Sequence, residues 1–185
     1  WETTVPGSIS SGIHVFQVND GYLVAGGNGG SVAGYHGGSL DGWLLKFDLN
    51  GNLSWDKCFG GSGEDMLTDI AKTYDGNYVV CGYTDSTDGD LTGLNHGNKD
   101  AWIISFDSNG TALWQKCYGG SGNDEALSFM KTDPNNTGGD NIFVGDTYSN
   151  DGDVSGNHGD RDIWVVAVSI SGAITHKKCF GESNF

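Results

Sequence analysis

The sequence is short of proline, of basic residues and of long apolar runs. Only two of its 185 residues are proline, so the chain is not a disordered, Pro-rich tail. Nine Lys and Arg residues stand against 24 Asp and Glu residues, which gives a formal net charge of −15 at pH 7. An acidic surface repels phosphate groups, so we expect no nucleic-acid partner and no binding to anionic membranes. No apolar run is long enough for membrane insertion.

Glycine and internal repetition are abundant instead. The chain has 32 glycines, which suits many tight turns between short strands. A segment that begins at His96, HGNKDAWIISFDSNGTALWQKCYGGSG, has counterparts that begin at His36 and His158. Within this segment one Trp and one Cys each recur in steps of 59 and 62 residues. Two independent markers with one period identify the chain as an array of repeated units.

Each unit has the pattern of two β-hairpins. In the second unit, residues 66–73 and 78–83 are predicted strands around an Asp-Gly-Asn turn. Residues 102–106 alternate apolar with other residues, and after an Asn-Gly turn a strand is predicted at 111–118. Residues 64–71 could be read as helical, but their counterpart in the first unit is β-branched and aromatic, which favours a strand.

The array predicts an all-β fold: a β-propeller of three four-stranded antiparallel blades plus one leading strand, as a segment of a larger propeller. Residues 1–8 align with the strand that contains Trp114 and would close a preceding blade; blade 1 would cover 9–62, blade 2 63–121 and blade 3 122–185. Propellers close with about 4–8 blades, so the two outermost faces should meet further blades or a second copy. Because the chain begins at Trp1 and not at Met, we expect a processed or excised product.

The units share the pattern GYT-DS-DGD-GxHGxxDxWxxxxDxNGxxxWxKCxGGSGxD. Over nearly the whole chain this pattern resembles the β-propeller repeats of secreted and surface proteins of bacteria, especially Bacteroidota, and of some archaea (SBBP-like repeats). The resemblance implies a propeller module and, in Bacteroidota, a part of a large cargo protein of the type IX secretion system. Two departures stand out: residues 28–34 replace the DGD loop in the first unit, and His176 replaces the Trp of Trp55 and Trp114.

Two acidic, glycine-rich loops are candidate metal sites. Carboxylates two residues apart on a tight turn can surround Ca²⁺ with oxygen atoms. The EF-hand spacing is missing, because Lys99 stands at the twelfth position counted from Asp88. The alternative is that these side chains bond the backbone of their own turn. The candidate ligands are Asp85, Asp88 and Asp90 in unit two and Asp151 and Asp153 in unit three, with Asn95, Asp100, Asn157 and Asp162 as further oxygen donors.

A His stands shortly before an Asp in every unit. The pairs are His36 with Asp41, His96 with Asp100, and His158 with Asp162. A His–Asp pair can support catalysis, but no nucleophile accompanies it at a fixed spacing, and one active site needs one constellation and not three. We therefore expect a His–Asp bond that locks the loop onto the next strand.

The four cysteines are predicted to be buried free thiols that act as small hydrophobes. Cys81 has no Cys counterpart and aligns with Ala25 and Gly145. The others occupy equivalent places in successive units, which should lie farther apart than the roughly 7 Å Cα reach of a disulfide. They are Cys58, Cys117 and Cys179.

The recurring tryptophans are predicted to fill the core between blades, and an aromatic platform for sugars could lie at Trp1 or Tyr35. The core tryptophans are Trp43, Trp102 and Trp164.

The leading functional hypothesis is a non-catalytic, extracellular scaffold, adhesion or interaction module of a secreted or surface protein. Calcium is the one candidate ion. The expected partners are other blades or a second copy, and also a glycan, a surface protein or the secretion machinery. The alternatives are a calcium-dependent carbohydrate-binding module and a propeller enzyme of the glycosidase or quinoprotein type. Residues 105–110 approach the sialidase Asp-box but carry Gly one place late, and Asp107, Gly110 and Trp114 match the quinoprotein repeat only loosely.

Overall fold

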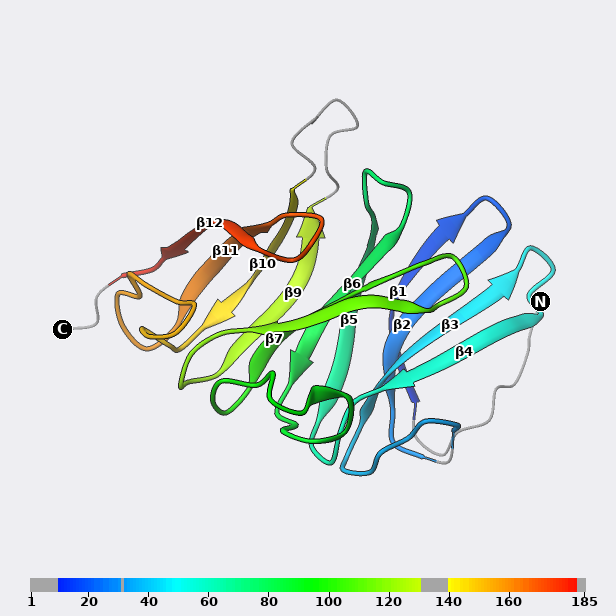
Figure 1. Ribbon diagram of the computed structural model, residues 1–185, viewed down its shortest axis with the longest axis horizontal. Coiled ribbons are helices and arrows are strands. Elements are labelled where there is room, and N and C mark those ends of the chain that lie inside the picture. The colour runs from blue at the N-terminus through cyan, green and yellow to red at the C-terminus, as the bar shows by residue number, and fades with distance from the viewer. Residues whose placement is uncertain (1–9, 31, 131–139, 183–185) are drawn as a thin grey trace.

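The computed structural model describes residues 10–30, 32–130 and 140–182. These residues form three four-stranded antiparallel sheets, which stand in a row in chain order (Figure 1). The first sheet contains β1 (Ser10–Val18), β2 (Gly21–Asn28), β3 (Asp41–Asp48) and β4 (Leu53–Phe59). The second contains β5 (Asp65–Lys72), β6 (Tyr78–Thr84), β7 (Asp100–Phe106) and β8 (Ala112–Tyr118), with the short 3₁₀ helix η1 (Gly89–Leu91) before β7. The third contains β9 (Asp124–Met130), β10 (Asn141–Thr147), β11 (Asp162–Val168) and β12 (Ile174–Phe180).

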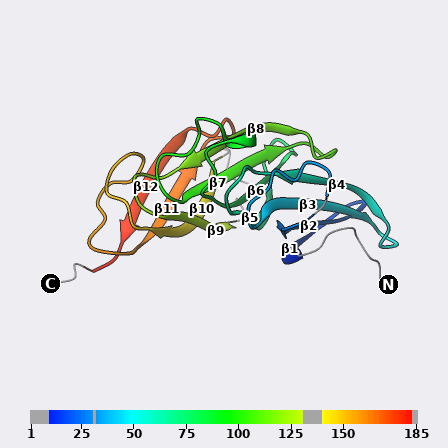
Figure 2. The same cartoon turned by 90° about the horizontal axis from the view of Figure 1, so that it is seen from below.

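Each sheet is a meander in which neighbours in sequence are neighbours in space. The first strands of the three sheets, β1, β5 and β9, contact one another in that order. Figure 2 shows these inner strands along the concave side of a curved row and the outer strands β4, β8 and β12 along its convex side. The predicted all-β, propeller-like array of three four-stranded blades is therefore confirmed. The leading strand predicted at residues 1–8 lies outside the described residues.

The predicted strands of the second unit agree with the structure to within two residues at each end. The segment that could be read as helical belongs to β5, because it pairs with β6 along its length. In the part of the chain that the structure describes, no helix is long and apolar enough to cross a membrane.

The alignment of Cys81 with Gly145 is wrong by one residue. Gly82 pairs with Trp102 and Gly145 pairs with Trp164, so the two glycines are equivalent. The residue equivalent to Cys81 is therefore Val144, which faces Ser128 as Cys81 faces Asp69. This position requires glycine, because a Cβ atom on Gly145 would stand 1.7 Å from the carbonyl oxygen of Glu125 in the neighbouring strand and clash with it.

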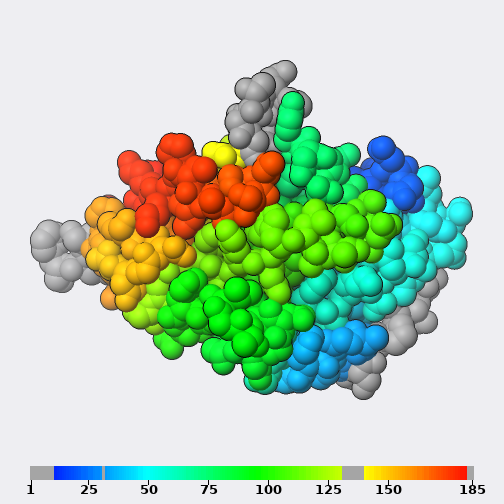
Figure 3. Space-filling view, viewed as in Figure 1, coloured from blue at the N-terminus to red at the C-terminus, as the bar shows by residue number. Residues whose placement is uncertain are grey.

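The two larger core clusters lie between blades, and Trp102 and Trp164 fill them as predicted, whereas Trp43 packs within the first sheet beside Leu45 and Phe47. Trp102 and Ile104 pack against Leu23 and Leu44 of the preceding blade. Trp164, Phe143 and Val166 pack in the same way against Val79 and Ile103. The three repeated tryptophans are between 0% and 3% exposed. Successive blades consequently abut on the face shown in the space-filling view (Figure 3).

Candidate functional site

The acidic loop of the second unit binds the backbone of a different turn. Asp85 accepts a hydrogen bond from the Glu64 amide, Asp88 from the Ser62 amide at 2.7 Å, and Asp90 from the Gly60 amide at 3.3 Å. The two amides between these are also satisfied by side chains, Gly61 by Asp65 and Gly63 by Ser86, at 2.8 Å each. Five successive amides of the turn 60–64 are thus held by oxygen atoms of blade 2. We call this arrangement the clasp.

A second clasp joins blades 2 and 3. Asp151 accepts a hydrogen bond from the Ser121 amide at 2.7 Å, and Ser149 accepts one from the Gly122 amide at 2.8 Å. Asp153 takes part through its backbone, since its amide donates to the Gly119 carbonyl at 2.8 Å and its carbonyl accepts from Lys177. The hydrogen bonds from Ser62 and Ser121 lower the pKa of Asp88 and of Asp151. The turns that donate these hydrogen bonds therefore stabilise the charged form of both carboxylates.

The proposed calcium ligands are not brought together. Among residues 10–30, 32–130 and 140–182, no three His, Cys, Asp or Glu side chains gather in a way that could hold a metal ion. Asp85, Asp88 and Asp90 point at three separate amides of one turn. The expected alternative was a bond to the backbone of the same turn. Asn95 and Asn157 make such bonds, to the amides of Gly97 and Gly159, whereas the aspartates bond the closing turn of the preceding blade. Calcium binding by these five aspartates stays a prediction.

The predicted His–Asp bond is present in every unit. The Nδ1 atoms of His96 and His158 lie 2.7 Å from the carboxylates of Asp100 and Asp162, and the corresponding distance from His36 to Asp41 is 3.1 Å. In each pair the backbone amide of the His donates to the same carboxylate oxygen. The aspartates are buried at the start of β3, β7 and β11, so the pair fixes the end of the long loop on that strand.

A second buried aspartate at each described junction was not singled out from the sequence. Asp65 and Asp124 are fully buried and accept hydrogen bonds from Thr84 and Ser86, and from Thr147 and Ser149, respectively. Burial raises the pKa of Asp65, as it does that of Asp41 and Asp100. The signal was the final Asp of GGSGxD, which recurs after 59 residues.

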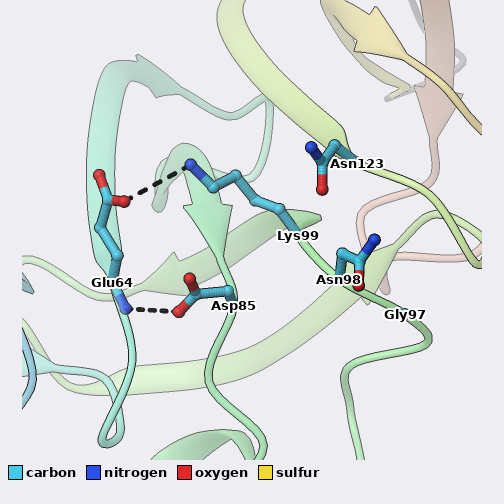
Figure 4. A pocket seen from close by; sticks show the side chains of 6 residues that line it. All are labelled: Glu64, Asp85, Gly97, Asn98, Lys99 and Asn123. Carbon is cyan, nitrogen blue, oxygen red and sulfur yellow. Dashed lines mark hydrogen bonds and ion pairs between the residues drawn. The ribbon is translucent and has the colours of Figure 1, made fainter.

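A polar pocket of about 600 Å³ opens beside the first clasp (Figure 4). Its cation is Lys99, whose Nζ lies 3.6 Å from Glu64 and 3.4 Å from Glu125. The same ammonium stands 4.1 Å from the centre of the Tyr83 ring. Two carboxylates and a ring face thus surround this charge, so Lys99 bridges three blade segments and is not available to pair with an anion.

The four cysteines are free, as predicted, and Cys58 is only partly buried. Burial raises the pKa of Cys58 and of Cys81 to about 12. Because the thiolate is the reactive form, these thiols are inert at neutral pH and serve packing.

A cluster of three polar residues lies on the concave side, where the sequence analysis found no motif. His14 of β1 and Ser128 of β9 both contact Asp69 of β5, with Nδ1–Oδ1 and Oγ–Oδ2 distances of 2.7 Å each. These three residues line a cavity of about 410 Å³. The carboxylate lies between the His and the Ser, whereas a catalytic triad has the imidazole between the carboxylate and the nucleophile. Asp69 therefore orients both neighbours, and no base touches the Ser128 hydroxyl within the cluster.

Comparison with known proteins gives a fold-level likeness at most. No family model and no curated protein matches the sequence. Among solved structures, a Synechocystis apocarotenoid oxygenase carrying a Glu150Asp mutation is similar, with a TM-score of 0.42 and 17% identity over 86% of this chain. The chain spans 35% of the length of that protein. A likeness of this size says nothing about activity, and the class that the fold defines is a propeller-like array of three blades.

Proposed function

We propose that this chain is a segment of a larger propeller and acts as a non-catalytic interaction module of a secreted or surface protein. The observation that carries the proposal is apolar surface that the described residues leave uncovered on β1 and on the third sheet. The face of each sheet that turns towards the following blade is here called the forward face; in blade 2 it comprises Val79, Cys81, Ala101 and Ile103, all 0% exposed.

The forward face of blade 3 has the same apolar character, and none of the described residues forms a blade on it. Val144 is 39% exposed, whereas the equivalent Cys81 is 0% exposed. Ile163 is 52% exposed, whereas the equivalent Ala101 is 0% exposed. A groove of about 440 Å³ on this face is lined in part by Ile142, Val165, Ala167 and Phe180. Uncovered apolar surface of this kind favours a partner.

The complementary half of such a junction lies on β1. Val15 is 62% exposed, and its equivalents are Ile70 and Phe129, which are buried against the preceding blade. The partner that fits the forward face of blade 3 is therefore another blade of this repeat. In a solution of this chain alone, that blade is blade 1 of a second copy, and head-to-tail contacts close into a ring or continue as an open chain.

Light scattering across a concentration series tests this partner. We expect reversible self-association that Val15→Asp and Ile163→Asp each abolish, because either charge would be buried without a counterion. Leu113→Asp is the matched control, since Leu113 lies on the outer strand β8 and is 51% exposed. A well-folded monomer at every concentration up to the solubility limit would contradict the proposal.

The absence of catalysis and the location are separate parts of the proposal. The repeated residues serve the His–Asp bonds and the core in every unit, and the clasps in units two and three, which supports a structural use of the motifs. Turnover of sialosides, or of an alcohol with a quinone, would contradict the non-catalytic part. Labelling of intact source cells and of their medium with a membrane-impermeant biotin reagent tests the location, and a protein protected from the reagent would contradict it.

A further inference from the structure

The cavity on the concave side draws its walls from all three blades. Its polar residues include His14, Gln17, Asp69 and Ser128. Its apolar walls are formed by Val15, Phe16, Ile70, Ala71 and Phe129. A volume of about 410 Å³ is within the usual range for small-molecule sites, which combine apolar walls with a few convergent polar groups.

The cluster breaks the repeat. His14, Asp69 and Ser128 occupy one register position in the three blades, opposite Ala25, Cys81 and Val144. A role that each blade needed for its own packing would favour one residue type at this position, as it does for the repeated Trp, His and Asp. Three different polar residues, of which His14 and Ser128 each bond Asp69, make a single asymmetric site.

Asp69 has no hydrogen-bonding capacity left for a charged ligand. Its Oδ1 accepts from His14 Nδ1 at 2.7 Å and from its neighbour, the Ile70 amide, at 2.8 Å. Its Oδ2 accepts from the Ser128 hydroxyl at 2.7 Å and from the Phe129 amide at 2.8 Å. Four donors satisfy a carboxylate. A cation would lose its hydration without gaining a free counterion here, and an anion would meet this carboxylate in a chain of net charge −15.

The polar groups that remain open are held in place by Asp69 or lie beside it. Because the Ser128 hydroxyl donates its proton to Asp69, its lone pairs are free to accept a hydrogen bond. Because Nδ1 of His14 is bonded to Asp69, Nε2 is the ring nitrogen left for a ligand. The exposed Gln17 amide can both donate and accept. Hydroxyl groups on a compact carbon skeleton both donate and accept hydrogen bonds, so they suit these groups next to apolar walls.

We propose that this cavity binds a neutral polyhydroxyl compound, that is, a sugar residue. Ser128 accepts a hydrogen bond from one hydroxyl group, Nε2 of His14 bonds a second one, Asp69 holds both side chains in place, and the apolar walls cover the C–H face of the sugar. The site needs no calcium and lies apart from the acidic loops. It goes beyond the proposed interaction function and does not depend on self-association.

Amide and histidine NMR spectra of the whole chain test the site with methyl glycosides of glucose, galactose and mannose. We expect at least one glycoside to shift the Ser128 amide and the His14 ring signals with a Kd on the order of 1–10 mM, a common strength for a few hydrogen bonds to a small ligand. Glucosamine and glucuronate have similar size and opposite charges. We expect both to bind at least tenfold more weakly than the best glycoside.

Variants separate the site from general surface effects. Ser128→Ala and Gln17→Ala should each weaken binding about three- to tenfold, as the loss of one hydrogen bond does. Ser108→Ala, at an exposed hairpin turn, is the matched control and should leave binding unchanged. The proposal is overturned if no glycoside shifts these signals at 50-fold the expected Kd, if a charged analogue binds best, or if Ser128→Ala folds and binds as the parent does. Because none of these readouts measures association or turnover, they fail independently of the proposed function.

Discussion

At the scale of single residues, the first glycine of each closing turn shares its space with two buried carboxylates. A Cβ on Gly119 would stand 2.6 Å from Asp124 Oδ2 and 2.8 Å from Asp100 Oδ1. A Cβ on Gly60 would stand 2.5 Å from Asp65 Oδ2. Any larger residue must displace an aspartate that has no polar alternative inside the junction. The glycine and the two aspartates therefore recur together.

We expect Gly119→Ala to lower the free energy of unfolding by about 1–3 kcal/mol, the usual cost of overpacking. Displacement of Asp124 should also speed hydrogen exchange of the Gly120 amide, because this amide donates a hydrogen bond of 2.8 Å to the Asp124 carboxylate. Gly76→Ala is the comparison, since no atom lies within 4 Å of its Cβ and φ is +91°. It should cost about 1 kcal/mol through the backbone alone and leave Gly120 exchange unchanged. Equal exchange in the two variants would refute the steric explanation.

At the scale of elements, the clasp explains why the acidic loops occur where they do. The loop after β6 hydrogen-bonds the turn that connects β4 to β5, and the loop after β10 does the same for the turn that connects β8 to β9. Blade 1 lacks the DGD sequence, and no preceding closing turn lies within the described residues. The carboxylates thus supply acceptors to backbone amides that no strand can pair.

Hydrogen exchange distinguishes this role from calcium binding. Asp88→Ala should speed exchange of the Ser62 amide at least tenfold and leave the Ser121 amide unchanged; Asp151→Ala should do the reverse. Asp88→Asn is the matched control, because its amide oxygen still accepts the bond. If EDTA speeds exchange of both amides in the parent protein and added calcium restores protection, the calcium prediction gains and the clasp alone is insufficient.

At the scale of the whole molecule, an acidic chain carries several carboxyl groups inside its junctions. Burial raises the pKa of Asp41, Asp65 and Asp100 above 3.8. The folded state consequently binds more protons than the unfolded chain above this value, and stability falls as the pH rises through the raised pKa values. Hydrogen bonds lower the pKa of Asp88 and Asp151 below 3.8, so their contribution is lost as the pH falls through the lowered values.

We therefore expect the melting temperature to rise as the pH is lowered from neutral towards 3.8 and to fall again below that value. Asp100→Asn should reduce the rise, because it removes one carboxyl group whose pKa is raised while its amide oxygen still accepts the hydrogen bond from the His96 amide. Calorimetry at constant ionic strength measures both curves. A melting temperature that rises nowhere between neutral pH and pH 3.8 would show that the buried carboxyl groups do not govern the pH dependence.

The period, the strands, the buried tryptophans and the His–Asp bonds could be predicted from the sequence. All of these depend on contacts within one unit or on a pattern that repeats in each, so alternation and spacing reveal them. The partners of the acidic side chains depend on the fold, because Asp88 meets Ser62 in the turn before its own blade. The pairing of strands also corrected the equivalent of Cys81 to Val144, because Gly82 pairs with Trp102 and Gly145 pairs with Trp164. The cluster of His14, Asp69 and Ser128 was equally hidden, because its members are separated by nearly a full period and share no residue type. Curvature of the array brings the three inner strands side by side, and no local pattern records that curvature.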